Sequence, residues 1–167
     1  MSSGPMGADD PAKESEEGAS TSAPARPDYR DTLRALGALI DAWGVRTARL
    51  WVSPAGVRVV VPTRFSERRY PWAQLQQMAE ARARLRGQRP PARRVPTARW
   101  EVVLRLAGEA MDRAGGEYFV VEAALGGVGQ AATCVVESPE GVVLSAEDAV
   151  LRQLEIARRY WRRGRRG

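Results

Sequence analysis

Apolar residues recur every three to four positions in four segments of the chain, the spacing of one face of an α-helix. Gly44 suits the end of the first helix, and Thr97 can cap the start of the third. The last helix is predicted to bury a stripe formed by Val150, Leu151, Leu154, Ala157 and Trp161. The predicted helices cover 28–43, the segment from Pro71 to just before Gly87, 97–114, and the segment from 145 or 146 towards the C-terminus.

Between the helices, short runs rich in β-branched and large apolar residues predict strands. Two turns with Pro in the second position and Gly in the fourth join strands, at 53–56 and 138–141. The chain is therefore predicted to be an α+β protein in which helices cover an antiparallel sheet. The predicted strands are 46–52, 57–61, 67–70, 117–125, 131–137 and 142–145.

The order of elements repeats along the chain. Residues 28–87 and 97–167 each read as an α-β-β-β-α half, separated by a proline- and arginine-rich linker at 88–96. The two proline–glycine turns align only with a further shift of 14 beyond the one that aligns the helices. Internal duplication about a pseudo-two-fold axis and chance similarity both stay open. A shift of 71 aligns Leu33, Arg34, Gly37, Asp41 and Gly44 with Leu104, Arg105, Gly108, Asp112 and Gly115.

Residues 1–27 are rich in Ser, Gly, Ala, Pro and acidic residues and show no apolar periodicity. Such a segment cannot bury enough apolar surface to offset the entropy lost on ordering, so we predict a disordered tail. Its two cations and five carboxylates give a net charge of −3. A solubilising tail is the simpler interpretation, and an acidic arm that shields the basic body is the alternative.

The rest of the chain is basic, with 24 arginines against 15 carboxylates, and the whole chain carries a net charge of +6. A basic body favours polyanionic partners. However, 25 of the 26 cationic residues are arginine, and Lys13 is the single lysine. Such a ratio also indicates a drift towards arginine codons, in which case an arginine excess does not mark a binding site.

Two arginine runs stand out from this excess, and each begins near the end of the second helix of its half. Guanidinium groups bind phosphates bidentately and keep their charge, so we predict that these runs bind nucleic acid, either RNA or DNA. The alternative is a charge run without a dedicated ligand, because the helix dipole favours cations at helix C-termini. The predicted binding residues are Arg82, Arg84, Arg86, Arg89, Arg93, Arg94, Arg158, Arg159, Arg162, Arg163, Arg165 and Arg166.

The chain has no histidine and one cysteine, Cys134, which excludes Cys/His metal sites and Ser–His or Cys–His nucleophile pairs. Cys134 is expected to be a buried, inert thiol within a strand. Glu122 and Glu137 are expected at an edge or on the solvent face of their neighbouring strands, and a pair of facing carboxylates is the alternative. The glycine-rich segment 126–129 lies between two strands, so it reads as a hairpin loop and not a phosphate loop. We therefore expect no cofactor, no metal and no enzymatic activity.

A protein–protein interaction module, for a partner protein or as a homodimer, is the alternative to nucleic-acid binding. Aromatic residues anchor such interfaces, and the predicted exposed patch consists of Trp51, Phe65, Tyr70 and Trp72. The third helix carries alternating charges at i,i+4 spacing, which predicts a solvated face formed by Glu101, Arg105, Glu109 and Arg113.

The expected location follows from two simple observations. A single cysteine favours a reducing compartment, and we expect the cytoplasm. No stretch offers about 18 uninterrupted apolar residues, so no membrane span is expected.

Overall fold

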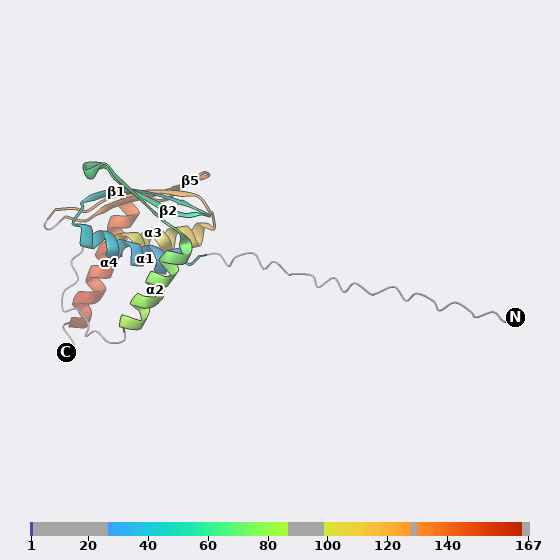
Figure 1. Cartoon of the computed structure of the whole chain (residues 1–167). Helices are drawn as coiled ribbons and strands as arrows, with labels where there is room; N and C mark the ends of the chain where they lie inside the picture. Colours follow the sequence, from blue (N-terminus) through green and yellow to red (C-terminus); the bar gives the residue numbers. More distant parts are fainter. Residues whose placement is uncertain (2–26, 87–98, 128–129, 165–167) are drawn as a thin grey trace.

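The computed structural model describes Met1 and residues 27–86, 99–127 and 130–164 (Figure 1). The predicted linker and nearly all of the predicted tail lie outside these residues. These described residues contain four α-helices and six strands, as the apolar pattern predicted. They are α1 (Tyr29–Trp43), β1 (Thr47–Ser53), β2 (Gly56–Val61), β3 (Ser66–Tyr70), α2 (Trp72–Arg86), α3 (Trp100–Ala114), β4 (Phe119–Ala124), β5 (Thr133–Ser138), β6 (Gly141–Leu144) and α4 (Ala146–Gly164).

The six strands form one antiparallel sheet in the order β3-β2-β1-β4-β5-β6. The four α-helices of the described residues lie on one side of it, and in this part of the chain no α-helix covers the opposite face (Figure 1). The predicted fold class, α+β with helices covering an antiparallel sheet, is confirmed. Strands β1 and β4 occupy the centre and pair with Leu50 opposite Val121.

The core lies between the sheet and the helices. Along β1 and β4 the buried residues alternate with residues that are half-buried or exposed, because successive side chains point to opposite faces. Strands from both halves contribute to one cluster, in which Leu50, Val59, Val121 and Val136 are almost completely buried. The two halves therefore share a single core.

Helices α1 and α3 lie side by side, and each supplies a cap for the other. The carboxylate of Asp41 in α1 accepts bonds from the backbone N–H groups of Trp100 and Glu101. Helix α3 starts after Arg99, whose side chain makes no capping bond. The predicted cap Thr97 lies outside the described residues. The first turn of α3 is thus stabilised by a carboxylate from another helix.

The two halves make equivalent contacts at the separation of 71 residues. Asp112 accepts bonds from the backbone of Tyr29 and Arg30, as Asp41 does from residues 100 and 101. Tyr29 Oη donates to the carbonyl of Gly116, as Trp100 Nε1 donates to that of Val45. These relations are those of a pseudo-two-fold axis between the halves. Descent from one duplicated unit stays a prediction.

The two proline–glycine turns do not take part in this equivalence. The turn at 53–56 joins β1 to β2, the first two strands of its half. The turn at 138–141 joins β5 to β6, the last two strands of the other half. Their shared sequence therefore does not support a duplication, because hairpins at different places can use the same turn chemistry.

Helix α4 faces the core differently from the prediction. Its buried residues are Ala149 and Gln153, and the amide of Gln153 bonds the backbone N–H and carbonyl of Ala132. Leu151 and Leu154, predicted to be buried, are 59% and 46% exposed. The burial of Trp161 is not described. The apolar stripe of α4 is thus only partly covered.

Within the described residues, no helix has the length and apolar character needed to cross a membrane.

Candidate polyanion-binding surfaces

The first predicted arginine run lies on α2 and in the segment after it. Arg82 pairs with Glu101 of α3, at 3.3 Å, and Arg84 pairs with Glu80 one turn earlier on α2, at 3.8 Å. Arg86 is the last residue of α2. Arg89, Arg93 and Arg94 lie outside the described residues. Arg82 and Arg84 of this run are therefore engaged by carboxylates.

The second run lies at the end of α4. Arg158, Arg159 and Arg162 are exposed, and within the described part of the chain they make no ion pair. Arg163 belongs to the same helix, whereas Arg165 and Arg166 fall outside the described residues. Helices α2 and α4 both extend away from the sheet (Figure 1). Both runs thus begin on the side of the molecule opposite the sheet.

The charged residues of α3 do not form the solvated face that was predicted. Glu101 is largely buried between helices and bonds Arg34 of α1, with 2.9 Å between Nε and Oε1. Burial raises the pKa of Glu101, but bonds and charges from Arg34 and Arg82 outweigh it, so the pKa is below its ordinary value. The charged side chains at i,i+4 spacing on α3 belong to a cluster between α1, α2 and α3, because the neighbouring helices pack over this face of α3.

The sheet itself carries an uneven distribution of charge that the arginine runs did not reveal. From the start of β1 to the end of β3 the sequence has five arginines and one acidic residue, Glu67. From the start of β4 to the end of β6 it has three glutamates and no cation. The half of the sheet formed by β1, β2 and β3 is therefore basic, and the other half is acidic.

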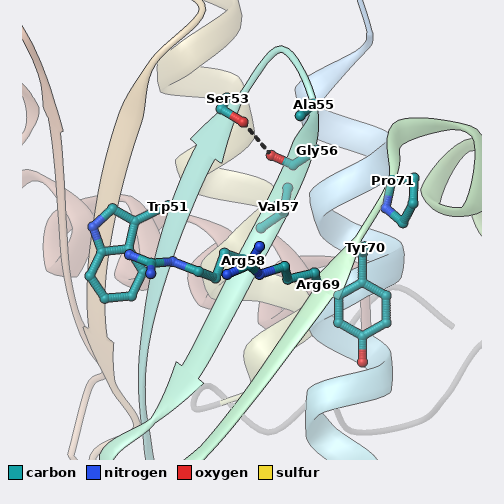
Figure 2. Close-up of a pocket in the computed structure, with 9 residues that line it drawn as sticks. All are labelled: Trp51, Ser53, Ala55, Gly56, Val57, Arg58, Arg69, Tyr70 and Pro71. Carbon is teal, nitrogen blue, oxygen red and sulfur yellow. Dashed lines mark hydrogen bonds between the residues drawn. The ribbon is translucent and has the colours of Figure 1, made fainter.

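Two of these arginines lie against a tryptophan on the open face of the sheet, and a third lies beside one of them. Strand pairing places Arg69, Arg58 and Trp51 in one row across β3, β2 and β1, as Figure 2 shows. The guanidinium carbons of Arg58 and Arg49 lie 4.0 Å and 5.0 Å from the centre of the Trp51 ring. Cation–π contact holds these guanidinium groups in place and leaves N–H donors for other ligands. We call Arg49, Trp51, Arg58 and Arg69 the basic sheet cluster.

The carboxylates next to this cluster only partly neutralise it. Glu67 pairs with Arg69, at 3.0 Å, and with Arg58, at 3.9 Å, whereas Glu122 pairs with Arg49, at 2.9 Å. All of these side chains are substantially exposed. Exposed ion pairs contribute about 0–1 kcal/mol, so a phosphate group can replace a carboxylate here at small cost.

Two hollows border the basic half of the sheet. The first, of about 460 Å³, is open and lies beside the basic sheet cluster, where Arg58 and Arg69 line it together with Tyr70 and Pro71 (Figure 2). The second, of about 310 Å³, is lined by Trp43, Arg64 and Arg68, and the Arg68 guanidinium lies 4.7 Å from the Trp43 ring. Each hollow is thus lined by an arginine of strand β3, Arg69 in the first and Arg68 in the second.

The four aromatic residues predicted to form an exposed patch do not form one. Tyr70 is buried, and Trp72 is half-buried with its indole N–H bonded to the carbonyl of Ser53. Phe65, at the tip of the β2–β3 connection, is 99% exposed. Trp51 is half-buried and belongs to the basic sheet cluster.

The residues expected to be inert have the environments that were predicted. Cys134 is buried, and burial raises the pKa of its thiol to about 12. Glu122 and Glu137 lie exposed on the open face of the sheet. Gly126 and Gly127 follow β4 in the connection to β5, and residues 128–129 lie outside the described residues. Among the residues described, no three acidic or cysteine side chains gather as a metal site requires.

Comparison with protein families, with curated proteins and with solved structures finds no match to this chain. Its candidate sites therefore rest on its own geometry.

The sequence contained a signal for the basic sheet cluster, but not one that a search for consecutive arginines can detect. Arg49 and Trp51 are two positions apart and therefore share a face of a strand. Arg58 and Arg69 join them only through the pairing of β1, β2 and β3. Comparing the net charge of residues 47–70 with that of residues 119–144, instead of searching for consecutive arginines, finds the asymmetry.

Proposed function

We propose that this protein is a non-enzymatic nucleic-acid-binding protein that holds a single strand on the basic half of its sheet. The observation that carries the proposal is the basic sheet cluster, in which Arg49 and Arg58 lie against an aromatic ring and Arg69 lies beside Arg58 in the same row. Positively charged surfaces that follow the backbone, together with aromatic side chains, are the means by which proteins bind single strands. The acidic half, with Glu122 and Glu137, repels phosphates and confines the strand to β1–β3.

The flat, open face favours a single strand over a duplex. Bases of a single strand are free to stack on Trp51 or on the guanidinium groups held against it, whereas duplex bases already stack on each other. Phe65 is a further exposed ring, directly before β3 in the β2–β3 connection, on the border of the same half. A single cysteine supports a reducing compartment, and we propose the cytoplasm.

The test is fluorescence anisotropy with labelled oligo(dT), oligo(U) and a duplex of equal length, at several salt concentrations. The double variant Arg58→Gln/Arg69→Gln should weaken binding to both single strands. The slope of log affinity against log salt should flatten by about 0.7 for each phosphate that the variant no longer neutralises. Trp51→Leu should weaken binding by about 1–3 kcal/mol for each stacked base.

The matched control changes the same charge on the other side of the molecule. Arg84→Gln/Arg159→Gln removes two exposed arginines of the two predicted runs and leaves the sheet intact. If this pair weakens binding and the sheet pair does not, the helix ends form the binding surface and the sheet does not. If the unmodified protein binds none of the three probes at low salt, the proposal fails.

A further inference from the structure

Helix α4 presents an unusual set of residues to solvent. Opposite its buried face, Glu147, Leu151, Leu154 and Arg158 follow one another at spacings of four, three and four, and all four are exposed. This spacing places them in one straight stripe along the helix, as in the seam of a coiled coil. We call these four residues the outer stripe of α4. Its two central positions are leucines, and its ends are an acid and a base.

The corresponding helix of the other half shows that the fold does not require these leucines. Counted from the first residue of each helix, the positions of the outer stripe are Ala73, Gln77, Glu80 and Arg84 in α2, and all are exposed. On α2 the acid and the base pair with each other, at 3.8 Å. On α4, within the described residues, Glu147 and Arg158 make no ion pair.

The outer stripe is complementary to itself in one orientation. When two copies of α4 lie antiparallel with Leu151 opposite Leu154, Glu147 of each copy lies opposite Arg158 of the other. All four positions then have a suitable partner, and a two-fold axis relates the copies, as in isologous dimers. Antiparallel helices also place the negative end of one dipole beside the positive end of the other.

From these relations we propose that the outer stripe of α4 is a homodimer interface, and that its partner is α4 of a second copy of this chain. Charge complementarity identifies a second copy of α4 as the partner, because the antiparallel arrangement places Glu147 of one copy opposite Arg158 of the other. In a parallel arrangement the two copies of Glu147 would face each other, and so would the two copies of Arg158. The stripe spans the twelve residues 147–158, or about 17 Å of helix from the first to the last. Interfaces of this size are at the small end of specific ones, so we expect a dissociation constant in the micromolar range or weaker.

This interface is independent of the nucleic-acid proposal, because it uses a different surface. The basic sheet cluster lies on the open face of the sheet, and α4 lies on the other side (Figure 1). A dimer formed through α4 leaves both sheets open.

The first experiment is analytical ultracentrifugation of the full chain, freed of nucleic acid, from about 5 µM to about 500 µM. The unmodified protein should show a monomer–dimer equilibrium. Leu151→Gln/Leu154→Gln, which gives α4 polar residues like those of α2, should raise the dissociation constant at least about tenfold. A matched control, Gln77→Leu on α2, tests whether any exposed leucine produces association. A protein that is monomeric throughout, or a dimer insensitive to the double change, overturns the proposal.

A charge exchange tests the pairing directly. Glu147→Arg alone and Arg158→Glu alone should each weaken the dimer, and the combined variant should restore it, since both pairs then reappear with opposite sign. Circular dichroism checks that the single variants keep α4 folded. Failure of the combined variant to recover dimerisation contradicts the antiparallel pairing.

Disulfide trapping fixes the register. Because the native Cys134 is buried and its thiol pKa is about 12, introduced cysteines are the reactive thiols. Mixing Leu151→Cys with Leu154→Cys under mild oxidation should give a crosslinked dimer faster than either variant alone. If Leu151→Cys crosslinks best with itself, the copies do not pair as proposed.

Discussion

Asp41 and Asp112 have the same task at equivalent places in the two halves: each caps the first turn of the helix to which the other belongs. Asp41 Oδ1 lies 2.9 Å from the Trp100 nitrogen, and Asp112 Oδ2 lies 3.0 Å from the Arg30 nitrogen. A carboxylate at a helix N-terminus satisfies unpaired N–H groups and opposes the helix dipole. The two aspartates therefore connect α1 and α3 at both ends.

The first prediction concerns these caps. Asp41→Ala should lower the free energy of unfolding by about 1–2 kcal/mol, because two N–H groups of α3 lose their acceptor. Asp112→Ala should cost about 0.5–1 kcal/mol, since Asp112 is more exposed to water. Urea denaturation measures both, and Glu117→Ala, at an exposed position in a connecting segment, is the control. Equal, negligible effects for all three variants would falsify the capping role.

The second prediction concerns the close approach of α1 and α3. A methyl group at Gly37 would collide with the carbonyl of Trp100, and one at Gly108 with the carbonyl of Tyr29. Both obstacles are backbone atoms, so Gly37→Ala and Gly108→Ala should each destabilise by about 1–3 kcal/mol as the helices move apart. Gly127→Ala, which meets only the flexible side chain of Gln130, should leave the Tm almost unchanged. A neutral Gly37→Ala would mean that the helices lie further apart.

The third prediction separates packing from hydrogen bonding at Trp100. Its side chain is 0% exposed, and its indole N–H donates to the carbonyl of Val45. Trp100→Ala should destabilise by about 3–5 kcal/mol because it leaves a large cavity. Trp100→Phe keeps most of the volume and should cost about 1–3 kcal/mol, through the unsatisfied carbonyl. Guanidinium denaturation of both variants tests this order; a Phe variant as unstable as the Ala variant contradicts it.

The fourth prediction is a pH dependence at Glu101. Its pKa in the folded state is below the ordinary value of 4.5, because Arg34 and Arg82 outweigh the effect of burial. Between the folded and unfolded pKa values the unfolded chain binds more protons, so stability rises with pH there. The contribution of Glu101 is complete above pH 4.5 and is lost as the pH falls through the folded pKa.

Glu101→Gln should therefore lower stability by about 1–3 kcal/mol at pH 7 and lose less stability on acidification than the unmodified protein. Thermal unfolding at pH 7 and at pH values below 4.5 measures the difference. Glu140→Gln, at the exposed β5–β6 turn, is the control for a change of charge alone. Parallel stability curves for the unmodified protein and Glu101→Gln would show that Glu101 does not titrate differently on folding.

The sequence singled out several residues that matter for the structure but did not indicate what each of them does. The shift of 71 aligned Asp41 with Asp112 and Gly37 with Gly108. It did not indicate that the aspartates cap each other's helices, or that the glycines allow two backbones to touch. These functions depend on contacts between segments far apart in the chain, which no local pattern records.

By itself the sequence determined the four helices, the six strands and the fold class, because periods of 3.6 and 2 residues reflect local backbone geometry. It also determined that Cys134 is buried within a strand. The tertiary structure decided which face of α4 meets the core, since α4 extends away from the sheet and leaves Leu151 and Leu154 uncovered. It also decided the position of the basic sheet cluster, because the order of strands and their register, not distance along the chain, brought Arg58 beside Trp51 and Arg69 beside Arg58.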